Sequence, residues 1–365
     1  MEIERLLQEA ELLPHGEARM KCYKDAWEIA DKEKDYDMQI DCRKKFIEES
    51  VFYSDIMQSF IAFPTMIKLM DEHYEEYGTT GEDYSGLWYY KYILYDAIDF
   101  YQISKKQFDA YLEDFRKRCI KYGYSLRTYY YLGYLFYGQV DLKKTDNFYK
   151  NYIMCNRDDL SDCKACELAT EIKIFLRKDD FETAKKIAKP LLNRSISCFE
   201  VPYATYGDFI DYCSFKTIKG EDVKIDHIDF MTKELHRVIT QKKILVVKYS
   251  GQMLLRYALT DRSKALNWYK KYLIPYENAN NPGFKYRFSI GAMVFWAGIK
   301  DKKTYKIKIP KASSVYQEND TYVPIDMCHH YRSIAEKIAN QFDQRNGTNL
   351  YSDKIQNILN YIKIQ

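Results

Sequence analysis

The sequence predicts an all-α protein in which helical hairpins stack into a right-handed α-α superhelix, a solenoid. Three observations predict this class. Apolar residues recur with helical periodicity along most of the chain, the helical segments follow one another in pairs, and residues that favour turns are scarce. The 365 residues include only 14 glycines and 8 prolines, whereas a sheet protein of this length needs many more residues for its turns.

The second helix of each predicted hairpin carries a small residue, followed four positions later by another small or apolar residue. A small side chain lets that helix lie close against its partner, and the pattern is typical of tetratricopeptide (TPR-like) repeats. Good copies occur at Ala26/Ala30, Ala62/Met66, Ala184/Ala188 and Ala265/Tyr269. Looser copies occur at Ala110/Asp114 and Thr145/Tyr149.

In chain order, this pattern predicts about seven hairpins of about 40 residues each. First helices are expected at 2–12, 36–52, 84–101, 125–138, 162–177, 199–218 and 243–259. Second helices are expected at 17–32, 55–75, 104–122, 141–155, 180–193, 226–239 and 262–273. One further helix is expected at 284–299.

The pattern changes near residue 300. Residues 304–310, TYKIKIP, alternate between polar and apolar and predict a short extended segment. Two amphipathic helices are expected after it, at 325–343 and 351–363. Because a solenoid needs an atypical last unit to cover its exposed core, we expect a solenoid over 1–300 and a capping segment over 301–365.

The charges are nearly balanced, with 56 basic and 53 acidic residues and a net charge of +3. Nucleic-acid channels and polybasic membrane patches need a concentrated excess of positive charge, so neither partner is expected. The first 20 residues carry acidic side chains. A signal peptide is instead cationic at its start and then uniformly apolar. No window approaches the roughly 18 apolar residues of a membrane span. We therefore expect a cytoplasmic protein.

Tyrosine is the compositional outlier, with 36 residues. Within the expected helix 125–138, the pair Leu132-Gly133 occupies the position of the Leu-Gly pair of a TPR repeat. This register places one side of the helix on the concave groove, where aromatic residues suit a binding surface. The partner-binding residues expected there and in the aromatic cluster at 88–92 are Arg127, Tyr130, Tyr134, Tyr137, Trp88 and Tyr92. The alternative is that these rings pack between helices.

Three of the nine cysteines lie at the starts of two predicted first helices that are one structural period apart. Cys163 and Cys166 open one first helix, and Cys198 opens the next first helix. Since successive first helices lie side by side in a solenoid, the three thiols are expected to meet. They predict a structural zinc site, with Glu200 or Cys155 as the fourth ligand. The alternatives are a redox pair and reduced thiols that only pack.

The chain resembles a family of uncharacterised bacterial tetratricopeptide-repeat proteins. The resemblance rests on RDDLSDCKAC (157–166), DFETAKKIAKPLL (180–192), CFEVP (198–202) and QFDQRNGT (341–348). It implies a helical-repeat fold and favours a common role for Cys163, Cys166 and Cys198, but it implies no activity. Some bacterial helical-repeat proteins of similar size act as immunity or regulatory partners, which is an analogy of fold.

The sequence has no phosphate-binding glycine loop, no His-Glu-x-x-His and no Gly-x-Ser-x-Gly motif. We therefore expect a non-catalytic scaffold that binds another protein or a peptide, with no cofactor other than the zinc. Its most specific form is an immunity-type neutraliser of a toxin or effector. The alternatives are a regulator whose superhelix closes on a signalling peptide, and a helical enzyme with an unrecognised site.

Overall fold

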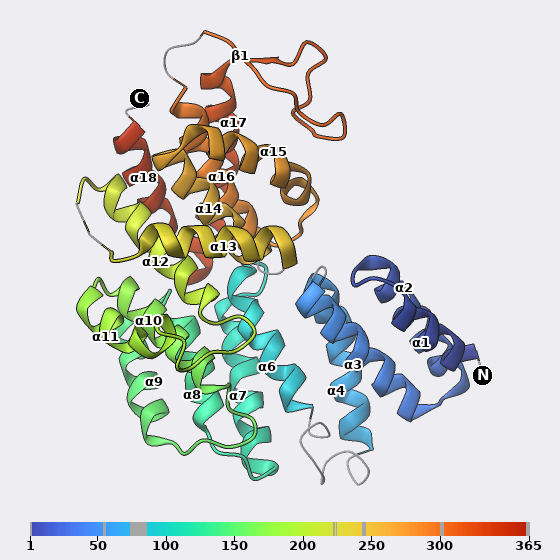
Figure 1. Cartoon of the computed structure of the whole chain (residues 1–365). Coiled ribbons are helices and arrows are strands. Elements are labelled where there is room, and N and C mark those ends of the chain that lie inside the picture. Colours follow the sequence, from blue (N-terminus) through green and yellow to red (C-terminus); the bar gives the residue numbers. More distant parts are fainter. Residues whose placement is uncertain are drawn as a thin grey trace. The chain divides into compact units, whose positions relative to one another are not determined.

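The computed structural model describes residues 2–53, 56–73, 86–221, 223, 225–242, 246–299 and 303–362. The chain is 76% helical, and its described part contains 17 α-helices and one two-stranded sheet (Figure 1). The predicted all-α class is confirmed. None of the described helices is both long enough and apolar enough to span a bilayer.

The chain divides into two compact units. The first unit comprises residues 1–137 and 141–161, and the second comprises 138–140 and 162–365. The boundary predicted at 300/301 lies on residues 300–302, which are outside the described ranges, and the capping role of 301–365 stays a prediction.

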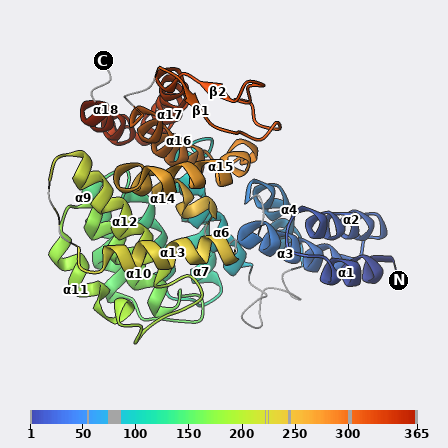
Figure 2. The ribbon, with the colours of Figure 1, turned by 45° about the horizontal axis from the view of Figure 1, so that its top comes forward.

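Consecutive helices of the first unit pack against one another, and α3, α6 and α8 also form a series of neighbouring first helices. Figure 2 shows α1 to α4 side by side. The described elements are α1 (Glu2–Leu12), α2 (Glu17–Glu33), α3 (Tyr36–Tyr53), the 3-10 helix η1 (Ile56–Gln58), α4 (Ser59–Glu72), α6 (Leu87–Asp96), the 3-10 helix η2 (Ala97–Asp99), α7 (Lys105–Lys121), α8 (Arg127–Tyr137) and α9 (Leu142–Met154).

In the second unit, each of the first helices α10, α12, α14 and α16 packs against the next. The helices are α10 (Lys164–Arg177), α11 (Phe181–Leu192), α12 (Tyr203–Ile218), α13 (Ile228–Lys242), α14 (Val246–Thr260), α15 (Arg262–Asn278), α16 (Pro282–Ala297), α17 (Pro324–Asn346) and α18 (Leu350–Ile362). The strands β1 (Tyr305–Lys306) and β2 (Thr321–Tyr322) pair antiparallel. This sequential packing is that of a helical solenoid.

Local capping residues explain where several helices begin. Ser104 forms a capping box with Gln107, so that two backbone N–H groups that lack partners within α7 are satisfied. Side-chain oxygens accept backbone N–H bonds at the starts of four other helices. These caps are Asp141 of α9, Asp180 of α11, Asp261 of α15 and Asn281 of α16.

The four good copies of the small-residue pattern lie in the core, and all eight residues are at most 2% exposed. Of the looser copies, Thr145 is fully buried, but Ala110 is exposed. The prediction for Ala110 is wrong because α7 buries a different stripe, which comprises Phe108, Leu112, Phe115 and Cys119.

Several predicted elements are shorter than expected. The helix expected at 84–101 ends at Asp96 and is followed by η2. The extended segment pairs only at Tyr305 and Lys306, although Ile307 and Ile309 beyond the strand are 4% and 2% exposed. The helix expected at 199–218 begins at Tyr203, because the preceding residues form a loop that ends in Pro202. That loop carries Cys198.

Candidate functional site

A pocket of about 310 Å³ lies among α7, α8 and α9 of the first unit. Three of its eight lining residues are aromatic and four carry charged or amide side chains. The lining residues are Asp109, Leu112, Glu113, Tyr129, Tyr137, Lys144, Asn147 and Phe148. Gly133 helps to form the wall, because a Cβ atom at this position would lie 2.2 Å from the ring of Phe148.

Tyr137 joins the aromatic wall to the polar lining. Its hydroxyl donates a hydrogen bond to the carboxylate of Asp109 and accepts one of 3.4 Å from the ammonium of Lys144. The same ammonium lies 4.6 Å from the centre of the Tyr137 ring. Burial, followed by the bond to Asp109, raises the pKa of Tyr137 well above its usual value, so the hydroxyl stays protonated and keeps donating.

Tyr134 does not lie on an open binding face. It is 1% exposed, and its ring packs against Tyr149 and Tyr152 with centroid separations of 5.0 and 6.4 Å. The expectation that Tyr134 lines a concave surface is therefore corrected: its side chain belongs to the core of the first unit. Tyr137 is also buried, at 2% exposure, but its ring lines the pocket.

Arg127 and Tyr130 are half-buried and engaged within the unit. The Arg127 guanidinium donates to the carbonyl oxygens of Tyr152 and Cys155 at 3.1 and 2.9 Å and lies 4.2 Å from the centre of the Tyr152 ring. A cation at this position stabilises the C-terminus of α9. Tyr130 packs edge-on against Tyr129. Partner contact by these two residues stays a prediction.

Trp88 and Tyr92 lie one helical turn apart on α6, and both are half-buried. The Trp88 indole donates a hydrogen bond of 2.6 Å to the Tyr92 hydroxyl. The ammonium of buried Lys91 lies 3.3 Å from the Trp88 ring centre and donates to the Leu160 carbonyl at 3.1 Å. These contacts fix the orientation of both rings, and whether they touch a partner stays a prediction.

The sequence reasoning missed Tyr129 and Phe148 as pocket residues. Tyr129 follows Arg127 in the same tyrosine cluster, but the assumed repeat register placed its neighbour Tyr130 on the binding side. Successive residues of a helix point about 100° apart. The assumed register therefore determined whether Tyr129 or Tyr130 was predicted to lie on the binding side. Phe148 lies opposite Gly133, and this large-to-small pairing was the available signal.

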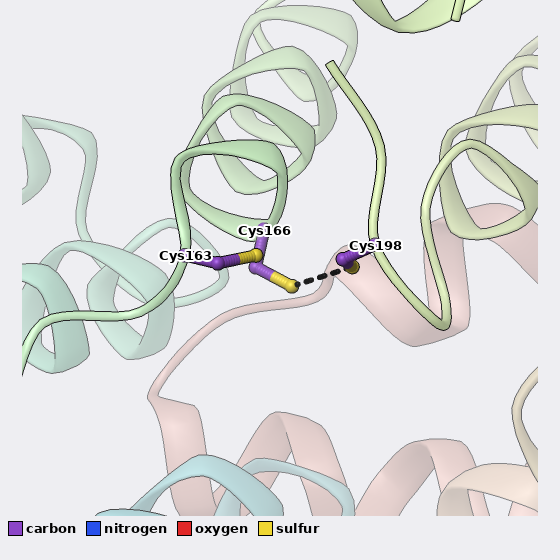
Figure 3. A group of neighbouring side chains, drawn as sticks. All are labelled: Cys163, Cys166 and Cys198. Carbon is purple, nitrogen blue, oxygen red and sulfur yellow. Dashed lines mark hydrogen bonds between the residues drawn. The ribbon is translucent and has the colours of Figure 1, made fainter.

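The three predicted thiols do meet in the second unit. Cys163 lies directly before α10, Cys166 lies in its first turn, and Cys198 comes from the loop before α12 (Figure 3). All three sulfur atoms lie within 4.8 Å of one another, and those of Cys166 and Cys198 are 3.4 Å apart. Cys163 is exposed and the other two are half-buried. The group can hold a metal ion.

Hydrogen bonding places the negative charge of the cluster on Cys198. Cys166 and Cys198 share a hydrogen bond in which either sulfur can donate. With the proton on Cys166, this bond, helped by backbone hydrogen bonds at Val201 and Glu200, lowers the pKa of Cys198 to about 6. The same bond, together with burial, raises the pKa of Cys166. The cluster therefore presents a thiolate at neutral pH, which is the form that binds metals.

A fourth ligand is not supplied by the described residues of the second unit. The carboxylate of Glu200, one predicted candidate, accepts hydrogen bonds of 3.0 and 3.2 Å from the ammonium of Lys248. Cys155, the other candidate, lies in the first unit. The sulfur separations suit zinc, since thiolates about 2.3 Å from a tetrahedral ion lie about 3.8 Å apart.

Comparison of the chain with protein-family profiles, with curated proteins and with solved structures finds no match. The resemblance to bacterial tetratricopeptide-repeat proteins therefore stays a prediction. What can be inferred about function comes from the pocket of the first unit and the thiol cluster of the second.

We expect Tyr134→Ala to lower the free energy of unfolding by about 3–5 kcal/mol, because it leaves a cavity between three packed rings. Asn147→Ala, on the exposed side of the pocket, should change it by less than about 0.5 kcal/mol. Urea denaturation followed by circular dichroism measures both. Equal, small effects of the two substitutions would contradict the core position of Tyr134.

We expect Cys198 of reduced, chelator-treated protein to react with iodoacetamide increasingly between pH 5 and 7, because its pKa is about 6. Buried Cys42, with a pKa of about 12, should stay unmodified over this range. Cys166→Ala removes the donor and should move the reaction midpoint of Cys198 toward about 8.5. Peptide mass spectrometry measures each site, and a midpoint near 8.5 in the unsubstituted protein would contradict the hydrogen-bonded thiolate.

Proposed function

We propose that the protein is a non-catalytic, cytoplasmic helical-repeat scaffold of TPR-like type that binds another protein through the pocket among α7, α8 and α9. The pocket is the observation that supports this function. Its volume of about 310 Å³ suits one anchoring side chain of a partner. Large anchors that fill preformed pockets supply most of the affinity of many protein interfaces.

The chemistry of the pocket favours an amphipathic anchor such as tyrosine or arginine. Tyr129, Tyr137 and Phe148 supply flat apolar walls, while Asp109 and Asn147 supply hydrogen-bonding groups. Tyrosine and arginine combine a flat surface with a polar end, and they are the anchors found most often in such pockets. Because packed helices hold the walls in place, little conformational entropy is lost when a partner binds.

The most specific form of this proposal is an immunity-type neutraliser, which forms a stable stoichiometric complex with one effector protein. The alternative is a regulator whose repeats close on a short signalling peptide. The two differ in solution. The conformation of a neutraliser is the same with and without its partner, whereas the repeats of a sensor become more compact when the peptide is added. Small-angle scattering separates them.

We expect the product of a neighbouring gene, when co-expressed, to form a stoichiometric complex with this chain. Asn147→Trp should fill the pocket from an exposed position and weaken that complex about tenfold or more, corresponding to about 1.4 kcal/mol. Lys150→Trp is the matched control, since Lys150 is exposed on α9 but does not line the pocket. Its affinity should be unchanged when measured by calorimetry. A complex that tolerates both substitutions equally would exclude the pocket as its anchor site.

We also propose that Cys163, Cys166 and Cys198 hold a structural zinc ion. The observation that supports this is the convergence of three sulfur atoms within 4.8 Å. A bound zinc would tie the start of α10 to the loop before α12, two segments between which the chain runs through α11. The ion would replace the proton of Cys166 by a stronger positive charge, and all three thiols would bind as thiolates.

We expect one zinc per chain by elemental analysis of protein purified without chelator. Cys198→Ser should lower this content severalfold because it removes one of three thiolates. Cys328→Ala, at a buried cysteine of α17 outside the cluster, should leave it unchanged. A zinc content far below one in the unsubstituted protein would rule out the site.

The fourth ligand can be identified with the same assay. Glu200→Gln tests whether the Glu200 carboxylate leaves Lys248 to become the fourth ligand of the ion. A lower zinc content would identify Glu200 as the ligand, and an unchanged content would exclude it.

A further inference from the structure

The C-terminal helix α18 lies over the first helices of the second unit. It packs against α17 and also contacts both α12 and α16. Since α14 lies between α12 and α16 and packs against each of them, a helix that touches both must lie over the face that successive first helices share. We call this surface, with the adjacent side of α18, the first-helix face.

Charged side chains from four helices gather on the first-helix face. Asp208 of α12 interacts electrostatically with Lys173 and Arg177 of α10, with Asp211 of its own helix and with Arg287 of α16. The positions agree with helical geometry. Lys173 and Arg177 are four residues apart, and Asp208 and Asp211 are three apart, so each pair lies on one side of its helix.

Lys354 of α18 belongs to the same cluster. It interacts with Asp211, Arg177 and Arg287, which also surround Asp208, and with Lys219 at the end of α12. Its ammonium lies 4.6 Å from the centre of the Phe215 ring of α12. These interactions bring together five cations and two carboxylates, and a third carboxylate, that of buried Asp343 of α17, interacts with the adjacent Tyr286. Positive charge is therefore in excess.

The cluster spans half-buried and exposed positions: Asp208 is half-buried, whereas Arg177 and Lys354 are exposed. Desolvation is the main cause that raises the pKa of Asp208 to about 6, against the lowering effect of three nearby cations. Desolvation also lowers the pKa of Lys354, although its side chain is exposed. These groups are thus surrounded closely by protein yet partly open to solvent. Charge–charge attraction is stronger in such an environment than on an open surface.

We propose that the first-helix face, together with Lys354 of α18, binds an acidic segment of a partner protein. The positive excess supplies the attraction, and complementary charges on a partner set specificity and the rate of association. This surface lies in the second unit and is independent of the pocket among α7, α8 and α9.

A protein segment fits this face better than a nucleic acid does. Asp208 and Asp211 lie among the cations and would repel a backbone that carries a phosphate at every nucleotide. A peptide can place its carboxylates beside the cations and neutral residues beside the two aspartates. Half-buried Phe215 also lies beside this cluster and offers apolar contact to such neutral residues.

The test uses the full chain and fluorescein-labelled hexaglutamate as the probe, with fluorescence anisotropy at low ionic strength. Arg177→Gln and Lys354→Gln, at two exposed positions of the face, should together weaken binding about tenfold. Lys186→Gln is the matched control, because it removes one exposed positive charge from α11 and should leave the affinity within about twofold. Thermal melting should be unchanged in both the double variant and the control.

Three results would overturn the proposal. One is no binding of hexaglutamate by the unsubstituted chain, and another is equal weakening by the control. The third is a hexathymidylate probe that binds as tightly as hexaglutamate and loses the same affinity in the double variant. The face would then bind anions in general, without preference for an acidic peptide. A complex that depends on Asn147 but not on Arg177 and Lys354 would leave the pocket proposal intact while refuting this one.

Discussion

The close approach of α14 and α16 is the constraint on which the second unit depends. A Cβ atom at Gly251 would lie 2.6 Å from backbone atoms of Arg287 and Phe288, and one at Gly291 would lie 2.8 Å from the backbone nitrogen of Leu255. The two helices thus touch backbone to backbone. A single hairpin cannot bury its apolar side alone, so each first helix must find a surface on the next. Glycine permits this contact to be close enough to exclude water.

The same contact places the charges of the first-helix face. Because α16 lies directly against α14, Arg287 is held at a defined distance from α12, where Asp208 and Asp211 are. Gly207 has the corresponding role between α12 and α14, since a Cβ atom there would lie 2.2 Å from the Tyr249 ring. In the first unit, Gly133 and Phe148 play this part, and the resulting gap among three helices is the pocket. In both units, packing of small against large residues positions the polar groups that could bind a partner.

Much of this architecture was predictable from the sequence, because its signals are local. The predicted helices agree with those observed, and the alanines of the repeat pattern are buried. The thiol cluster was also predictable, since a spacing of one structural period brings successive helix starts together. The binding surface was not. Tyr134 and Tyr129 have the same chemistry, yet one lies in the core and the other lines the pocket.

By itself, the sequence determined the all-α class, the order and approximate positions of the helices and the meeting of Cys163, Cys166 and Cys198. These features depend on periodicity, capping residues and repeat length, which act over a few turns of helix. The tertiary structure alone decided which tyrosines are exposed and which charges converge with Lys354. Helix rotation is set by packing against neighbours distant in sequence, and one residue of register turns a side chain by about 100°.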